Sequence, residues 1–171
     1  MKRHTALRDA CIVMTLLDTG LRVSELARLN VGDVDLNAGS MVVRPFGTGN
    51  KTKGRVVYFG KTTKKTLWRY AIDRYEHEPL FLTVDEGRMD RNSIRCMLNY
   101  LGKNAGVPNC HPHRFRHTFA IEYLRAGGDV FTLQRLLGHS TLQMVQNYLA
   151  LVPADVARAY RSPSDIATLK Q

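Results

Sequence analysis

The sequence has little of what marks disulfide-rich, metal-binding or nucleotide-binding chains. Its three cysteines are far apart and form no CxxC pair, so neither a disulfide framework nor a zinc motif is indicated. Cys110 stands near His113 and His117, but these histidines fit other roles better, and we predict no metal site. The glycine-rich run at 47–54 is followed by Arg55 where a P-loop requires lysine, which excludes that motif. We expect no cofactor.

Acidic residues are also scarce. Lysine and arginine number 25 against 15 aspartates and glutamates, which gives a formal net charge of +10. An excess of this kind favours a polyanionic partner, and we predict nucleic acid in preference to membrane headgroups. No apolar run approaches the ~20 residues that span a membrane, and the start MKRHTALRDA lacks the apolar core of a signal peptide. We therefore expect a cytoplasmic, nucleoid-associated protein with no membrane partner.

The length suits one domain over residues 1–171, with a short tail at 161–171. Hydrophobic periodicity and cap residues predict helices at 5–18, at 61–78, at 93–103, and from an N-cap at Ser24. Short β-type runs at 41–44, 55–59 and 79–84 predict three strands, of which the first two form a hairpin with a flexible basic tip. The predicted fold is an α+β, mainly α-helical domain in which a small antiparallel three-stranded sheet packs beside a helical bundle.

The chemically unusual stretch runs from His113 to Tyr148. A helix that begins near His113 places His113, Arg116 and His117 on one face, because their spacing is i, i+3 and i+4. Gly138 is typical of a helix end, and the serine that follows His139 is typical of the start of the next helix. His139 is therefore predicted in a turn, with Tyr148 about two turns into the second helix.

This pattern resembles the signature of the tyrosine recombinases, the phage integrase family. The matching residues are His113-x-x-Arg116-His117-Thr118-Phe119-Ala120, then Leu137-Gly138-His139-Ser140, then Tyr148. The earlier segment TGLRVSELARL at 19–29 resembles the first arginine box of that family. The resemblance extends from about Leu7 to about Tyr160, and several boxes in the expected order make a far more specific signal than any one of them.

The resemblance implies a catalytic constellation for breaking a phosphodiester. Arg22 and Arg116 would bind the phosphoryl oxygens through their planar, permanently charged guanidinium groups. His113 and His139 would add hydrogen bonds as charge builds in the transition state, and His113 is the candidate base for the nucleophile. That nucleophile would be the phenol of Tyr148.

Glu25 and His117 are expected to support this site, Glu25 by orienting basic groups around Arg22. The family also carries a catalytic lysine on a hairpin of this kind, which here would protonate the leaving 5′ oxygen. Lys51 and Lys53 compete for that role, and alignment leftward from RVVYF favours Lys51. Thr48 stands where alignment on the first glycine of the loop would put the lysine.

The activity implied is cleavage and rejoining of double-stranded DNA through a covalent 3′-phosphotyrosyl intermediate, without metal or ATP. The family also implies a homotetramer on DNA, although a lone domain is expected to be a monomer in solution. Full members usually carry an N-terminal helical domain that clamps the other side of the duplex. This chain begins almost at the first helix of the catalytic domain, so we expect either a fragment or a short relative.

Two other functions are compatible with the same residues. One is a DNA-binding or regulatory module of this fold that performs no cleavage, and the other is relaxation of DNA in the manner of a type IB topoisomerase. Each residue also has a structural interpretation: Tyr148 as a core tyrosine, His139 as a helix cap and Arg22 as a solvated surface arginine. If all of these structural interpretations held, the residues of the family signature would have to occur by chance at several positions in the right order. The catalytic interpretation is therefore favoured.

Overall fold

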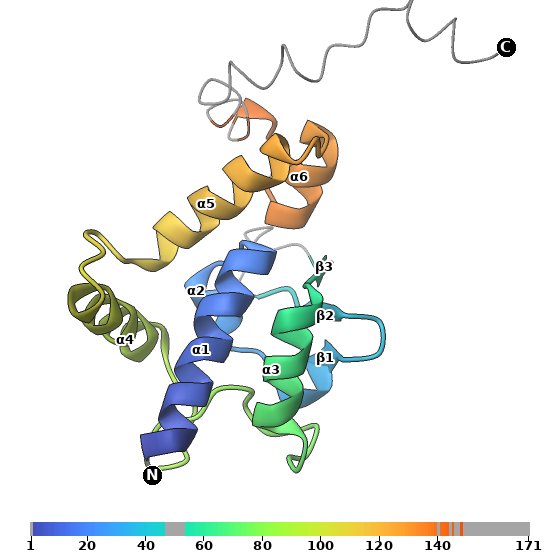
Figure 1. Cartoon of the computed structure of the whole chain (residues 1–171). Coiled ribbons are helices and arrows are strands. Elements are labelled where there is room, and N and C mark those ends of the chain that lie inside the picture. The colour runs from blue at the N-terminus through green and yellow to red at the C-terminus, as the bar shows by residue number, and fades with distance from the viewer. Residues whose placement is uncertain (1, 47–53, 140, 144, 146–147, 149–171) are drawn as a thin grey trace, which may run out of the picture.

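The computed structural model describes residues 2–46, 54–139, 141–143, 145 and 148. Its elements, in chain order, are α1 Lys2–Thr19, α2 Val23–Leu26, the 3-10 helix η1 Val31–Asp33, β1 Val34–Asp35, β2 Ser40–Val43, β3 Arg55–Tyr58, α3 Lys61–Ala71, α4 Arg91–Asn104, α5 Pro112–Arg125 and α6 Val130–Leu137 (Figure 1). The prediction of a mainly helical α+β domain with a three-stranded antiparallel sheet is confirmed. None of the described helices is long and apolar enough to cross a membrane.

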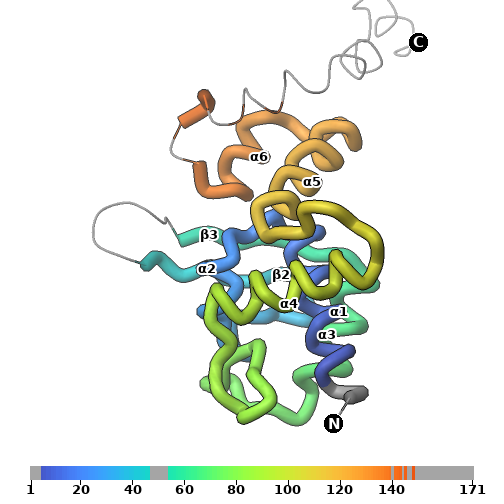
Figure 2. Tube along the Cα trace, turned by 90° about the vertical axis from the view of Figure 1, so that its left-hand side faces the viewer, coloured from blue at the N-terminus to red at the C-terminus, as the bar shows by residue number. Residues whose placement is uncertain are grey.

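Two apolar clusters hold the described part of the chain together. The larger one includes Cys11, Ile12 and Leu16 of α1, all fully buried, together with residues of the sheet, α3 and α4. The smaller one joins α5 and α6 and includes Leu137 and Tyr148. Figures 1 and 2 show α5 and α6 at one end of the molecule, next to the C-terminal end of α1. The groups predicted for the site collect along the boundary between these two clusters.

The sheet has the strand order β1-β2-β3, with each neighbouring pair antiparallel. Met41 of β2 pairs with Val57 of β3, and both side chains are buried on the face toward α1 and α3. The adjacent pair Val42 and Val56 lies on the opposite, partly exposed face, as the two-residue period of a strand requires. The predicted hairpin is therefore confirmed, and its tip at 47–53, with Lys51 and Lys53, lies outside the described residues.

The third strand was predicted at the wrong place. The sheet is completed by β1, and the segment 79–84 forms only isolated bridges, from Pro79 to Asn30 and from Leu82 to Arg88. The consecutive residues Leu80 and Phe81 are both buried, so this segment lies along the core without the alternation of a sheet strand. A two-residue strand such as β1 is too short for periodicity to reveal.

The start of α2 and the end of α3 also differ from the prediction. Arg22, and not Ser24, is the N-cap of α2, because the Glu25 carboxylate turns back and accepts a hydrogen bond from the Arg22 backbone N–H at 2.9 Å. Helix α3 ends at Ala71 and not near residue 78. The segment after it is a turn in which Tyr75 is 71% exposed, so the predicted stripe does not continue there.

Candidate active site

Helix α5 delivers Arg116 into the interior. Pro112 occupies the first turn of α5, where its fixed φ suits a helix start and its missing N–H costs no hydrogen bond. Arg116 is 3% exposed and donates from Nη1 to Gly20 O at 2.7 Å and from Nη2 to Leu137 O at 2.6 Å. Burial, followed by the positive charge of Arg22, lowers the pKa of Arg116 to about 10. It therefore stays cationic at neutral pH, and hydrogen bonds to the described residues occupy two of its five N–H groups.

Arg22 reaches the same place from the loop between α1 and α2. Its Nη1 donates to Glu25 Oε1 at 3.1 Å, and its Nη2 lies 3.5 Å from Gly138 O. The side chain is 32% exposed, in contrast to the buried Arg116. Arg22 thus offers an accessible guanidinium beside a buried one, which is the arrangement predicted for binding two phosphoryl oxygens.

Glu25 is the shared acceptor of two arginines, and one of them is a residue that the sequence reasoning missed. Arg55, the first residue of β3, donates to Glu25 Oε1 from Nη1 at 2.9 Å and to Oε2 from Nη2 at 2.8 Å. Burial alone would raise the pKa of Glu25, but hydrogen bonds from Arg55 and Arg22 outweigh it and hold that pKa below the ordinary 4.5. The only available signal for Arg55 was a charged residue at the start of an apolar strand.

His139 stands in the turn after α6, as predicted. Gly138 ends α6 in the left-handed conformation, with φ of 64°. Burial, followed by the positive charges of Arg116, Arg22 and Arg55, lowers the pKa of His139 to about 4. Its Nδ1 is buried and meets no hydrogen-bond partner among the described residues. At neutral pH His139 is an uncharged imidazole beside three guanidinium groups.

Tyr148 is packed among histidine rings. It is 5% exposed, lies in the smaller apolar cluster, and stacks parallel to His139 at a centroid separation of 6.5 Å. His117 meets it edge-on at 4.8 Å and in turn meets His113 at 5.5 Å. Burial, followed by the neighbouring His117 and Arg116, lowers the pKa of His113. His117 therefore stands between the predicted base and the predicted nucleophile.

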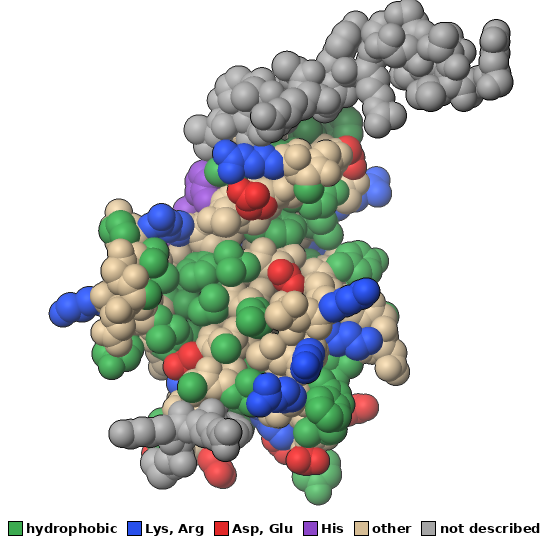
Figure 3. Space-filling model, viewed as in Figure 1, with side chains coloured by type: hydrophobic (Ala, Val, Ile, Leu, Met, Phe, Trp, Pro, Cys, Tyr) green, Lys and Arg blue, Asp and Glu red, His purple; other side chains and the backbone are tan. Residues whose placement is uncertain are grey.

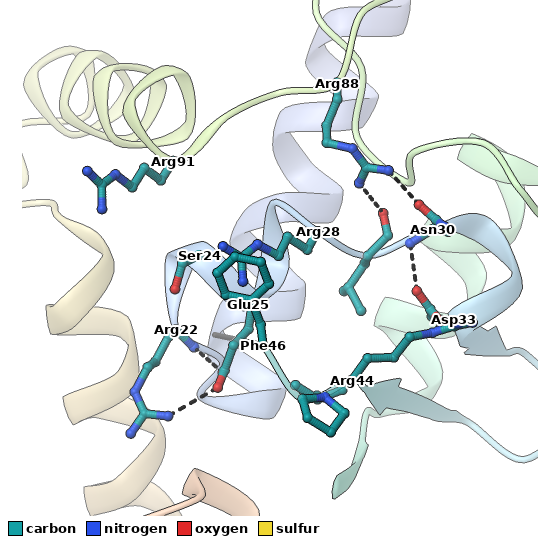
Figure 4. A pocket seen from close by; sticks show the side chains of 13 residues that line it. Arg22, Ser24, Glu25, Arg28, Asn30, Asp33, Arg44, Phe46, Arg88 and Arg91 are labelled. Carbon is teal, nitrogen blue, oxygen red and sulfur yellow. Dashed lines mark hydrogen bonds and ion pairs between the residues drawn. The ribbon is translucent and has the colours of Figure 1, made fainter. Parts of the chain in front are cut away.

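Two cavities adjoin part of this site, and Arg22 and Ser24 line both. The smaller, of about 540 Å³, is lined by Leu21, Arg22, Val23, Ser24, Arg95, His111, Pro112, His113 and Arg116. The larger, of about 800 Å³, includes five arginines: Arg22, Arg28, Arg44, Arg88 and Arg91 (Figure 4). On the face seen in Figure 3, histidine side chains reach the surface at the level of α5 and α6, near basic side chains. The site is a basic groove suited to a polyanion.

The structure brings together seven of the predicted residues: Arg22, Glu25, His113, Arg116, His117, His139 and Tyr148. The hairpin lysine, Lys51 or Lys53, lies outside the described residues, but the larger cavity is lined by Val43, the last residue of β2, and by Pro45 and Phe46 after it. In the part of the chain that the structure describes, no group of three or more His, Cys, Asp or Glu side chains is arranged to hold a metal ion.

Comparison with known proteins decides the family. The model of the phage integrase family matches residues 1–154. The chain belongs to the phage integrase family. Among curated members, the tyrosine recombinase XerC of Staphylococcus carnosus (strain TM300) is 35% identical over 163 residues, which cover 92% of this chain and 54% of the relative. XerC of Corynebacterium efficiens is 37% identical over 158 residues, covering 90% and 50%.

Solved structures of this family share the fold. The crystal structure of XerA recombinase superposes with a TM-score of 0.74 at 32% identity, covering 96% of this chain and 56% of that one. The Tn1549 transposon integrase in complex with circular intermediate DNA gives a TM-score of 0.67 at 30% identity, covering 88% and 57%. The chain thus spans about half the length of the integrase-family relatives it matches.

Proposed function

We propose that this chain is the catalytic domain of a site-specific DNA recombinase that cleaves and rejoins double-stranded DNA through Tyr148. The observation that carries the proposal is the convergence of Arg22, Arg116, His139 and Tyr148 beside a groove rich in arginine. Membership of the phage integrase family and likeness to recombinases support it. The large basic groove is suited to the DNA backbone on either side of the cleaved phosphate.

The proposed reaction exchanges one ester for another. The Tyr148 oxygen attacks the scissile phosphorus in line, the bond to the 5′ oxygen breaks, and the 3′ phosphate remains joined to the tyrosine. The remaining N–H groups of Arg116 and Arg22 hold the non-bridging oxygens, where negative charge builds in the transition state. Because the phosphotyrosyl ester retains the energy of the broken bond, a 5′ hydroxyl from another strand can reverse the step without ATP.

Proton transfers complete the proposed mechanism. His113, through the adjacent His117, is the candidate acceptor for the Tyr148 proton. The uncharged His139 is suited to donate a hydrogen bond to a phosphoryl oxygen. Lys51, with Lys53 as the alternative, is the proposed donor of a proton to the leaving 5′ oxygen. Exchange between two duplexes breaks four strands, and each covalent link occupies one Tyr148, so we propose four copies in the recombining complex.

Trapping the covalent intermediate tests this function. A pool of duplexes, each nicked close to a candidate cleavage position so that the 5′ fragment diffuses away, is incubated with the protein in EDTA and run on a denaturing gel. A slow-migrating adduct is expected with the wild-type chain and is lost in Tyr148→Phe. Tyr70→Phe is the matched control, because Tyr70 is also buried, at 4% exposure, but lies on α3 away from the groove.

The possible outcomes separate the candidate functions. An adduct formed by wild type and Tyr70→Phe but not by Tyr148→Phe supports the proposal. Measurable DNA binding without an adduct on any sequence contradicts it and favours a binding module without cleavage. Relaxation of supercoiled plasmid in EDTA without strand exchange would favour the topoisomerase-like activity.

A further inference from the structure

Three consecutive backbone carbonyls at the end of α6 each accept from a different arginine. Leu136 O accepts from Arg55 Nε at 2.6 Å, Leu137 O accepts from Arg116 Nη2 at 2.6 Å, and Gly138 O lies 3.5 Å from Arg22 Nη2. The last carbonyls of a helix have no partner within the helix and carry the negative end of its dipole. Cations from β3, α5 and the cap of α2 therefore meet at one helix end, directly before His139.

Arg55 differs from the other two arginines in lining neither of the two cavities, whereas Arg116 lines the smaller one and Arg22 lines both. Its side chain is 8% exposed, and Nε, Nη1 and Nη2 each donate to a protein oxygen. Arg22, in contrast, is one-third exposed and lines both cavities. Arg55 can act on a bound phosphate only through the groups that it holds.

The groups that Arg55 holds are both parts of the proposed site. Through Glu25 it fixes the carboxylate that accepts from the Arg22 side chain at 3.1 Å and from the Arg22 backbone at 2.9 Å. Through Leu136 O it fixes the end of α6, and hence the turn that carries His139. A Cβ at Gly138 would come within 3.0 Å of Arg55 Nη1, so the guanidinium lies directly against this turn.

We propose that Arg55 is a positioning residue for phosphodiester cleavage: it locks Arg22 and the His139 turn into one geometry from the strand that leaves the hairpin tip. This inference rests on the proposed recombinase function. Arg55 is also the second described residue after 47–53, the segment that includes Lys51 and Lys53. The Arg55 side chain thus connects β3, the strand next to the predicted lysine, to Glu25 of α2 and to the end of α6. Lysine cannot replace it, because a single ammonium cannot make the bidentate contact and the third bond together.

The first test needs no DNA. Arg55→Lys keeps the positive charge but loses the planar guanidinium, and the titration of His139 is followed by NMR from pH 8 to pH 3, so that the range includes the lowered pKa of the wild-type imidazole. The charged and titratable groups around His139 are Arg116 and His113 of α5, Arg22, Arg55 and Tyr148. We expect the pKa of His139 to rise by about one unit or more toward its ordinary value, because the turn loosens and water enters.

Arg74→Lys is the matched control. Arg74 is also largely buried, at 12% side-chain exposure, and donates to one carboxylate, Glu78, and to the carbonyls of Pro79 and Leu80. It lies away from the groove, so its replacement should leave the titration of His139 unchanged. If the pKa of His139 shifted equally in Arg55→Lys and Arg74→Lys, the shift would reflect a general loss of packing, and the inference would be overturned.

The second test uses the nicked DNA that yields the most adduct. Single-turnover cleavage by Arg55→Lys should be slower by on the order of a hundredfold, because small misplacements of catalytic groups have effects of this size. The Kd for DNA should stay within about twofold, since a buried Arg55 makes no DNA contact. Arg74→Lys should cleave at the wild-type rate. A variant that keeps both the His139 titration and the cleavage rate would overturn the inference.

Glu25→Gln carries the test if Arg55→Lys does not fold. The amide keeps the shape of the carboxylate but breaks the ion pair from the other side. Loss of a negative charge by itself lowers the pKa of a nearby histidine, whereas loosening of the turn raises that of His139, so the sign separates the two causes. A lowered or unchanged pKa would overturn the inference. If wild type forms no adduct at all, the proposed function fails, while the NMR result still decides whether Arg55 fixes the His139 turn.

Discussion

Glu25→Ala should be among the most destabilising changes in this site. The Glu25 and Arg55 side chains are 4% and 8% exposed, and the carboxylate accepts four hydrogen bonds from Arg55 and Arg22. Removing one partner of a buried ion pair leaves the other charge uncompensated and costs about 3–5 kcal/mol. Because a domain has only ~5–15 kcal/mol of stability, the melting temperature should fall by roughly 10 °C or more.

The pH dependence of this loss has a defined sign. The pKa of Glu25 is lowered in the folded state, so its contribution is present above the ordinary value of 4.5 and is lost as the pH falls through the folded-state pKa. The difference in unfolding free energy between wild type and Glu25→Ala should therefore be largest near pH 7. It should begin to shrink near pH 4.5, where the carboxylate of the unfolded chain takes up its proton, and should vanish once the pH falls below the lowered pKa of the folded state.

Urea unfolding followed by circular dichroism, at pH 7 and at steps down to pH 3.5, measures both quantities. Glu122→Ala is the control, because Glu122 pairs with Arg125 at the surface, with side chains 61% and 52% exposed. Such pairs contribute at most about 1 kcal/mol. A loss in Glu25→Ala no larger than in Glu122→Ala, or one that does not change with pH, would refute the reasoning.

Three further predictions address the turn, the histidine and the groove. Gly20→Ala should lower the unfolding free energy by roughly 2–4 kcal/mol in urea titrations, because φ is +60° and a Cβ would collide with Phe119. Gly106→Ala is the control, since Gly106 has φ of +67° but open space around it. It should lose only the free energy of backbone strain, about 1–2 kcal/mol. His139→Gln should lose less stability than wild type between pH 6.5 and pH 4, since the lowered pKa of His139 makes the wild-type folded state resist protonation; equal losses would contradict the buried, uncharged imidazole. Arg91→Gln should weaken binding equally to unrelated duplexes and reduce the slope of log K against log salt by about 0.9, as expected for one phosphate contact in the groove; an unchanged slope would remove Arg91 from the DNA-binding surface.

Much of the site was predictable because its signals are local. The i, i+3, i+4 spacing of His113, Arg116 and His117 depends only on helix geometry, and α5 carries all three. Gly138 ends α6 because the left-handed conformation disfavours residues with a Cβ. The order of these motifs along the chain was enough to indicate the integrase family, and the family match over residues 1–154 confirms it.

Long-range contacts were not predictable in this way. Arg116 donates to the carbonyl of Gly20, 96 positions away. Arg55 donates to the carboxylate of Glu25, 30 positions away, and to the carbonyl of Leu136, 81 positions away. Nothing in the neighbourhood of Arg55 in the sequence distinguishes it from a solvated basic residue. The edge strand β1 was missed for a related reason: two residues carry no period, and their pairing with β2 decides their conformation.

Periodicity, capping and glycine conformation act over a few residues, so they indicate from the sequence alone which side chains are available and which face of each helix they occupy. The tertiary structure decided which cations remain accessible and which are buried. The packing of α6 against α5 and β3 leaves Arg22 exposed to the groove, while Arg55 is enclosed by Glu25 and Leu136 O. Burial and long-range hydrogen bonds depend on the folded structure. Only the structure could therefore separate Arg22, proposed to bind phosphate, from Arg55, proposed to hold it in place.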